Sequence, residues 1–318
     1  MSHPLIEFFM NPVLNLLGHP ASLRKVIEQH PGLKARFSPQ VTNIDEASVL
    51  RWNQFGENHL PTWADFSGGQ VQGWARTAEG YVGDRLEVPE LRCIGTIDRA
   101  EGVQLDITDI FGLSASKSVL ADFNTLADFA EARCQHYIQN MSQEGIDENL
   151  AHHEVGIRKA TTSDFFVRYA WDGRIWLCNE GGSHHFAAAQ WIAMKIGASV
   201  PLTGKLITHG LDLAAIERLA QRFRGFLISA EPAPFAAFTQ AMAAVEAAYY
   251  CCDMGNQHPS AKLVLLPQSD VRSMRAAELL DQADFTDALF ILRAVALQAK
   301  KNMAGPGFAR EARQMTRP

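Results

Sequence analysis

The chain has 318 residues, of which 47% are hydrophobic and 20% charged, a composition typical of a globular protein with one elaborated domain or two. Its net charge of −6 at pH 7 argues against general nucleic-acid binding, which favours clustered Lys and Arg. The five cysteines include no C-x-x-C pair, so we expect reduced thiols rather than a disulfide frame or a zinc knuckle.

We expect a cytoplasmic protein that does not enter a membrane. No run of the sequence reaches the ~18 apolar residues that a membrane span needs. The N-terminal segment contains Glu7 and lacks the basic stretch that opens a secretory signal peptide.

The first 150 residues predict a mixed α/β accessory region. Segments rich in β-branched and aromatic residues indicate short strands at 71–74, 86–88, 92–97 and 103–107. A helical spacing of apolar residues favours a long helical region over 114–143, ended by Gly145. The polar stretch 147–149 then marks the expected boundary with a second domain at 151–318.

A hairpin is the clearest local prediction of the second domain. Residues 165–169 combine β-branched and aromatic side chains in alternation, which suits a strand. Asp172-Gly173 is a strong signal for a tight turn, and residues 175–178 are expected to form the returning strand.

A helix is expected directly after this hairpin. Gly181 and Gly182 precede Ser183, a residue type that favours the N-cap position. The helix-forming sequence runs from His184 to a stop at Gly197.

Strands and helices alternate in the rest of the chain, which favours an α/β core. We expect strands at 200–208, 226–228 and 262–266, and helices at 211–223, 232–250, 272–281 and 284–303.

The start of the helix at His184 has the features of an anion site. The first turn of a helix leaves backbone N–H groups unpaired and carries the positive end of the helix dipole. Glycines before it let an anion approach the backbone closely. His184 and His185 lie in this turn and Glu180 stands just ahead, so the sequence indicates a phosphate site without a Walker lysine.

The stretch GGSHHFAAAQ resembles the signature of the ParB/sulfiredoxin superfamily. Sulfiredoxins carry Gly-Gly-Cys-His-Arg-Tyr, ParB-type proteins carry Gly-Glu-Arg-Arg-aromatic-x-Ala-Ala, and the free-serine kinases of this fold carry Asp-Gly-His-His-Arg. In each case the motif follows a hairpin strand and opens a helix. Val200-Pro201 matches a Val-Pro pair that often begins the next strand, so the resemblance covers about 165–207.

The resemblance implies an α/β fold with a ParB/sulfiredoxin-like core of mixed sheet and helices over 151–318. It also implies a nucleotide-binding enzyme, a phosphotransferase or an NTP hydrolase that uses Mg²⁺. Ser183 stands where sulfiredoxins have the catalytic cysteine, and His185 stands where the family has a phosphate-binding arginine. Sulfiredoxin chemistry is therefore not expected.

The resemblance also implies roles for the residues in and around the motif. We expect a nucleoside triphosphate to place its phosphates on the backbone of Gly181, Gly182 and Ser183, in contact with His184 or His185. Glu180 would bind Mg²⁺ or act as a general base. Arg158 and Lys159, just upstream, would neutralise phosphate charge.

Three alternatives stay open at this point. The domain could be a non-catalytic nucleotide switch or a module that binds a protein partner or a second copy. It could be a ParB-type DNA-associated protein, although the net charge disfavours this. A metal site could also combine His152-His153 with His184-His185, although the spacing indicates no third ligand.

Overall fold

The computed structural model describes residues 12–35, 42–54, 69–159, 161–254 and 260–304. The chain forms two compact units, each assembled from separate segments. Unit 1 comprises 1–38, 51–95 and 212–295, and unit 2 comprises 39–50, 96–211 and 296–318. Both units combine helices with a sheet, so the predicted α/β class is confirmed.

Unit 1 is built on one antiparallel sheet with strand order β2-β1-β9-β10-β8. Its elements are α2 (Ala21–Gln29), η1 (Pro31–Leu33), η3 (Trp52–Gln54), β1 (Gln70–Thr77), β2 (Gly80–Glu87), α3 (Pro89–Arg92), α7 (Leu213–Arg222), β8 (Phe223–Ser229), α8 (Pro232–Ala244), β9 (Tyr249–Asp253), β10 (Ala261–Pro267) and α9 (Val271–Gln282), where η marks a short 3₁₀ helix. Phe226 and Val264 pack against α8 and α9 in its core.

Unit 2 is built on a mixed sheet with strand order β3-β7-β5-β6-β4, in which β5 runs antiparallel to β6 and parallel to β7. Its elements are η2 (Glu46–Ser48), β3 (Gly95–Asp106, whose first residue belongs to unit 1), η4 (Ile107–Asp109), β4 (Ile110–Leu113), η5 (Leu120–Asp122), α4 (Leu126–Arg133), α5 (Gln143–Leu150), β5 (Phe165–Tyr169), β6 (Ile175–Cys178), α6 (Ser183–Ile196) and β7 (Pro201–Leu211). The last helix, α10 (Ala288–Ala304), has residues in both units.

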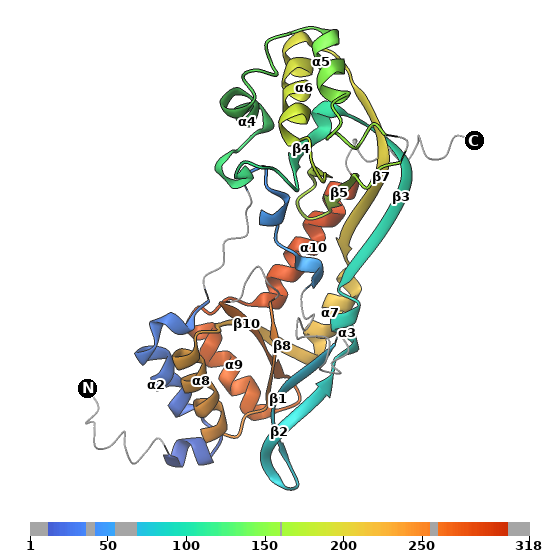
Figure 1. Cartoon of the computed structure of the whole chain (residues 1–318). Coiled ribbons are helices and arrows are strands. Elements are labelled where there is room, and N and C mark those ends of the chain that lie inside the picture. The colour runs from blue at the N-terminus through green and yellow to red at the C-terminus, as the bar shows by residue number, and fades with distance from the viewer. Residues whose placement is uncertain (1–11, 36–41, 55–68, 160, 255–259, 305–318) are drawn as a thin grey trace. The chain divides into compact units, whose positions relative to one another are not determined.

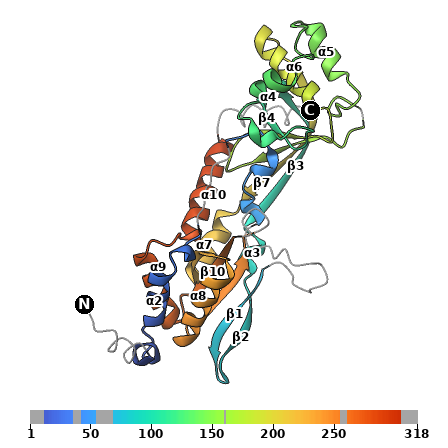
Figure 2. The ribbon, with the colours of Figure 1, turned by 60° about the vertical axis from the view of Figure 1, so that its left-hand side comes forward.

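Helix α6 is the central helix of unit 2. It packs against α4 and α5, and the three helices lie together in both ribbon views (Figures 1 and 2). Side chains of β5 alternate between the two faces of the sheet. Phe166 lies in the core that contains the buried face of α6, whereas Val167 and Tyr169 pack in a separate cluster with Trp176.

The hairpin and helix predicted around residue 180 are confirmed. Strands β5 and β6 pair antiparallel, and the N–H of Gly173 donates to the carbonyl of Tyr169 at 2.8 Å to close the turn. Helix α6 ends at Gly197 in the left-handed conformation, as expected for a glycine stop.

The predicted long helix over 114–143 is wrong. Thr125 caps α4 and Ser142 caps α5, each by accepting a backbone N–H with its hydroxyl. These caps start new helices where the apolar spacing alone indicated a continuous one. Gly145 lies inside α5 and does not end a helix.

The division expected at residue 150 differs from the observed units. Leu150 is the last residue of α5, which packs on α6 inside unit 2. The polar residues 147–149 belong to this helix rather than to a linker. The helix expected over 232–250 ends at Ala244, and Tyr249 begins β9 instead.

Within the described part of the chain, every helix is too short or too polar to span a bilayer. Residues 1–11, on which the expectation of no signal peptide rests, lie outside the described ranges.

Replacing Ile192, which is fully buried on α6, should destabilise unit 2. We expect Ile192→Ala to lower the free energy of unfolding by about 2–5 kcal/mol, because it removes buried methyl groups and leaves a cavity. Met194→Ala on the same helix, where Met194 is 55% exposed, should change it by about 0.5 kcal/mol or less. Chemical denaturation measures both variants, and equal effects would contradict the described packing of α6.

Candidate functional site

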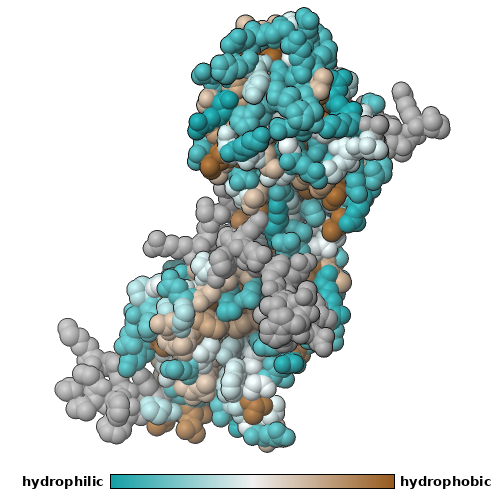
Figure 3. Space-filling view, in the orientation of Figure 1, coloured by the Kyte–Doolittle hydropathy of each residue, from teal (hydrophilic) through white to brown (hydrophobic). Residues whose placement is uncertain are grey.

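A pocket of about 1030 Å³ opens at the N-terminal turn of α6 in unit 2. It is lined by histidines, hydroxyl side chains and charges of both signs from the loop after β4, from the end of α4 and the loop that follows it, from the loop after α5, and from the start of α6 with the residues just before it. The lining residues are Ala115, Ser116, Lys117, Arg133, His136, Tyr137, His152, His153, Glu154, Gly156, Lys159, Thr161, Thr162, Ser163, Asp164, Glu180, Gly181, Gly182, Ser183, His184 and His185. In Figure 3, hydrophilic side chains predominate on the visible face of the helices α4 to α6.

Gly182 is required at the start of α6 by conformation and by space. It occupies the N-cap position with φ of 69°, a left-handed backbone that favours glycine. A Cβ at this position would lie 2.8 Å from the carbonyl group of Glu154 and from Val155 Cγ2. The start of α6 therefore packs closely against the backbone of Glu154.

The predicted N-cap role of Ser183 is wrong. Gly182, in the left-handed conformation, occupies the N-cap position, and Ser183 is the first residue of α6. The Ser183 side chain instead takes part in a hydrogen-bond network with Ser116 and His184. The Ser183 hydroxyl donates a hydrogen bond to the Ser116 hydroxyl at 2.9 Å and lies 3.3 Å from His184 Nδ1. His184 Nε2 lies 3.1 Å from the Ser118 hydroxyl, so both imidazole nitrogens face hydroxyl groups.

The tautomer of His185 follows from its neighbour Asn149. The Asn149 amide nitrogen donates to two carbonyls, those of Tyr137 at 2.9 Å and Gly145 at 2.8 Å. Its amide oxygen is therefore an acceptor, and it lies 3.0 Å from His185 Nδ1. Nδ1 must carry the hydrogen, which leaves Nε2 of the neutral ring with the lone pair.

Both imidazoles are held neutral near pH 7. Burial, followed by the nearby charge of His152, lowers the pKa of His185 to about 4. His185 stacks on His152 with ring centroids 3.7 Å apart and contacts the Tyr137 ring. Burial and the Lys117 charge also lower the pKa of His184, whose ring packs against Phe129.

Three carboxylates line the pocket in different environments. Glu154 pairs with Lys117 at 3.2 Å, and this contact lowers its pKa. Asp164 is 6% exposed, and burial raises its pKa although it accepts backbone N–H groups, including that of Glu180 at 3.2 Å. Glu180 is exposed, so its carboxylate is the most accessible of the three.

Three basic side chains also line the pocket, namely Lys117, Arg133 and Lys159. Of the two upstream basic residues indicated by the sequence, Lys159 is among them, and its ammonium group donates to the His153 carbonyl. Arg158 is not a lining residue and pairs instead with Asp147 at 3.3 Å.

The two histidine pairs line the same pocket, and they meet where His185 stacks on His152. The near-parallel rings of His152 and His185, tilted by 14°, cannot direct their lone pairs at a single metal. In the described ranges, no group of three or more His, Cys, Asp or Glu side chains could hold a metal ion.

Several residues of the site were not singled out by the sequence. Ser116, Ser118 and Asn149 come from distant segments that carry no motif of their own, and the fold alone brings them to α6. Arg133 ends α4, within a span where the apolar spacing indicated one continuous helix.

The chain belongs to a family of unknown function (DUF6685), which matches residues 100–304, more than half of the chain. This range includes every residue that lines the pocket. No curated protein and no solved structure matches the chain significantly.

A methyl group on Gly182 should destabilise the protein far more than one on Gly181. We expect Gly182→Ala to cost about 2–5 kcal/mol, because a left-handed alanine costs roughly 1–2 kcal/mol and overpacking adds roughly 1–3 kcal/mol. Gly181→Ala is the matched control, since its Cβ would meet Glu154 at an ordinary 3.4 Å. Denaturant unfolding of both variants measures the difference, and equal stabilities would contradict the geometry.

His185 should stay neutral throughout the mildly acidic range. Its folded pKa of about 4 lies below the ordinary value of 6.5, so its contribution to stability is complete above pH 6.5 and is lost as the pH falls toward 4. Histidine NMR signals, with His185→Gln for assignment, should show no titration of His185 above pH 5. A midpoint near 6.5 would contradict a partly buried ring bound to Asn149.

Proposed function

We propose that this chain is a nucleotide-binding enzyme that transfers or hydrolyses a phosphoryl group, with the phosphates bound at the start of α6. The observation that carries the proposal is the pocket itself, in which a helix N-terminus and three basic side chains meet. Unpaired N–H groups and the helix dipole favour an anion there. Lys117, Arg133 and Lys159 supply positive charge around the same opening.

The two adjacent histidines have different roles in this proposal. His184 has hydroxyl partners on both nitrogens, so it can pass a proton between Ser118 and Ser183. Neutral His185 uses its N–H for Asn149 and directs a lone pair elsewhere, which would repel a phosphate oxygen. The backbone N–H groups and His184 therefore contact the phosphate. His185 stabilises the wall of the pocket through its contacts with Asn149 and His152.

Glu180 and Asp164 are the residues that would hold Mg²⁺. Magnesium bound with a nucleotide takes one or two carboxylates, and the phosphates and water complete its coordination, so a cluster of three protein ligands is not needed. The exposed Glu180 carboxylate fits this use better than Asp164, which is buried and already accepts backbone N–H groups. Bound Mg²⁺ would neutralise phosphate charge.

A nucleotide should raise the melting temperature of the full chain, since a ligand of the folded state adds about 2.7 kcal/mol of stability at a concentration of 100 Kd. We expect a rise with one of ATP, CTP, GTP or ADP in the presence of Mg²⁺. Lys159→Gln should reduce the rise because it removes a lining charge, whereas Arg158→Gln should retain it because Arg158 lies outside the pocket lining.

The outcomes also separate the alternative functions. Phosphate release with the stabilising nucleotide supports an enzyme, and binding without turnover supports a nucleotide switch. No rise with any nucleotide at millimolar concentration would overturn the proposal.

A further inference from the structure

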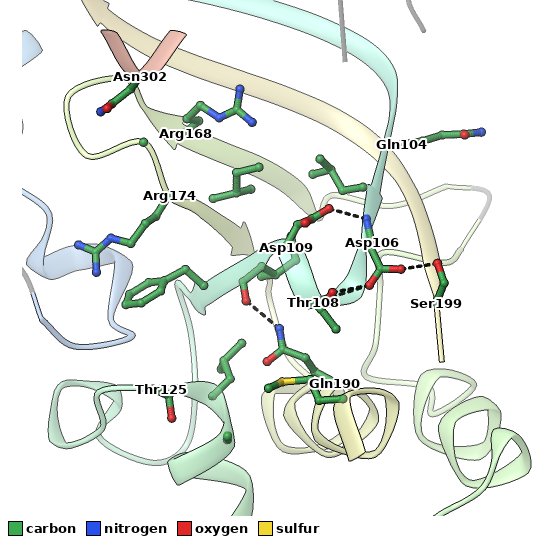
Figure 4. A pocket seen from close by; sticks show the side chains of 18 residues that line it. Gln104, Asp106, Thr108, Asp109, Thr125, Arg168, Arg174, Gln190, Ser199 and Asn302 are labelled. Atoms are coloured by element: carbon green, nitrogen blue, oxygen red, sulfur yellow. Dashed lines mark hydrogen bonds between the residues drawn. The ribbon is translucent and has the colours of Figure 1, made fainter. Parts of the chain in front are cut away.

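A second pocket, of about 930 Å³, lies elsewhere in unit 2, and several of its polar side chains are engaged within the fold (Figure 4). Asp106 accepts hydrogen bonds from the hydroxyls of Ser199 and Thr108, both at 2.6 Å. The Gln190 amide nitrogen donates to backbone carbonyls of η4 and β4, at 2.8 and 2.7 Å. These bonds hold α6 and the segment before β7 against η4, so we assign these groups a structural role.

A different chain of hydrogen bonds runs through the start of α6 and ends at a serine hydroxyl. Ser183 donates its hydroxyl hydrogen to Ser116 at 2.9 Å. Since a hydroxyl has one hydrogen, the Ser183 oxygen can only accept from His184 Nδ1, which lies 3.3 Å away. The hydrogen of the neutral imidazole is therefore on Nδ1, and Nε2 keeps the lone pair. Ser118 Oγ is 3.1 Å from Nε2, so Ser118 donates to it.

The imidazole of His184 is able to accept the proton of Ser118. Burial, followed by the positive charges of Lys117 and Arg133, lowers the pKa of His184, so the ring is neutral near pH 7. A serine hydroxyl becomes a nucleophile when an adjacent base takes its proton and a third group orients that base. Ser118, His184 and Ser183 stand in these three positions.

The loop after β4, which carries Ser118, is fixed beside α6 by a buried asparagine. Asn179 is 5% exposed, and its side-chain amide accepts the Ala115 N–H at 3.3 Å and donates to the Ala115 carbonyl at 3.0 Å. The same amide nitrogen donates to the carbonyl of Gly181, just before α6, at 2.9 Å. Within the loop, Ser116 Oγ accepts the Ser118 N–H at 3.1 Å. These bonds hold the serine and the imidazole at a defined distance.

Ser118 lies at the border of the pocket at the start of α6. It is half-buried, and its neighbours Ser116 and Lys117 line this pocket, as does His184. Arg133 also lines the pocket, and its charge and that of Lys117 both act on the His184 ring. A phosphate that pairs with these two cations is therefore brought to the ring that accepts the serine proton.

We propose that Ser118 is the nucleophile of this site and takes up the phosphoryl group as a phosphoserine; this inference rests on the phosphoryl transfer proposed above. Ser118 Oγ forms a bond to the terminal phosphorus, the bond from phosphorus to the bridging oxygen breaks, and the nucleoside diphosphate leaves. The hydroxyl proton passes to His184 Nε2. Water or an acceptor hydroxyl then attacks the phosphorus and releases its proton to solvent, and His184 returns its proton to Ser118 Oγ as the Oγ–P bond breaks.

Reaction of the full chain with diisopropyl fluorophosphate tests the nucleophile without a nucleotide. This uncharged probe phosphorylates an activated serine and releases fluoride, and we expect one adduct, mapped to Ser118 by peptide mass spectrometry. His184→Gln should slow the labelling by about 10²-fold or more, because it removes the base. Ser260→Ala, which removes an exposed serine of unit 1, is the control and should be labelled as the wild type is. No adduct on Ser118, or equal rates in the wild type and His184→Gln, would overturn the proposal.

Turnover of the stabilising nucleotide tests the phosphoserine. With Mg²⁺ and this nucleotide, acid-quenched wild type should carry phosphate on Ser118. Ser118→Ala should keep the rise in melting temperature but lose phosphate release, because the attacking oxygen is gone. Release by Ser118→Ala at the wild-type rate would overturn the phosphoserine and leave the proposed function intact. Absence of any rise with a nucleotide would overturn the proposed function and the phosphoserine with it, while the fluorophosphate labelling decides separately whether Ser118 is a nucleophile.

Discussion

The left-handed backbone of Gly182 determines how α6 begins, and the first pocket depends on it. Without a side chain at this position, the carbonyl of Glu154 approaches the helix start closely. The loop that carries His152, Glu154 and Lys159 is thereby held beside the first turn of α6. The start of α6 therefore forms one wall of a pocket that is lined with charged side chains.

Helix α6 has a role in both pockets of unit 2. Its first turn lines one pocket, and Gln190 and Met194, further along the helix, line the other. Between these positions its buried alanines, Ala187, Ala188 and Ala189, let neighbouring elements approach closely. The rigid packing of the helix therefore fixes the polar groups of both pockets relative to one another.

The polar network and the burial around His184 and His185 explain why both imidazoles are neutral near pH 7. Asn149 is itself buried and is oriented by two carbonyls, and this orientation determines which nitrogen of His185 carries the hydrogen. Burial then favours the neutral ring, because a charged imidazole loses solvation in the interior. The positive charge of the pocket comes from Lys117, Arg133 and Lys159 instead.

Local patterns in the sequence were enough to predict the hairpin and helix around the motif. The Asp172-Gly173 turn, the strand alternation and the Gly197 stop all depend on neighbours in the chain. The position of Ser183 was predicted incorrectly because both Gly182 and Ser183 are acceptable cap residues, and only the contact with Glu154 decides between them. Asn149 and Ser118 could not be assigned, since their histidine partners lie far away in sequence and reach them only in the folded unit.

The most direct measurement is the change in backbone amide NMR signals when the stabilising nucleotide and Mg²⁺ are added to the labelled protein. Binding at the start of α6 predicts the largest shifts at the amides of Ser183, His184 and His185. The amides of the β1–β2 hairpin in unit 1 should be unchanged. Shifts confined to other parts of the chain, or no shifts with any nucleotide, would contradict a phosphate site at this helix.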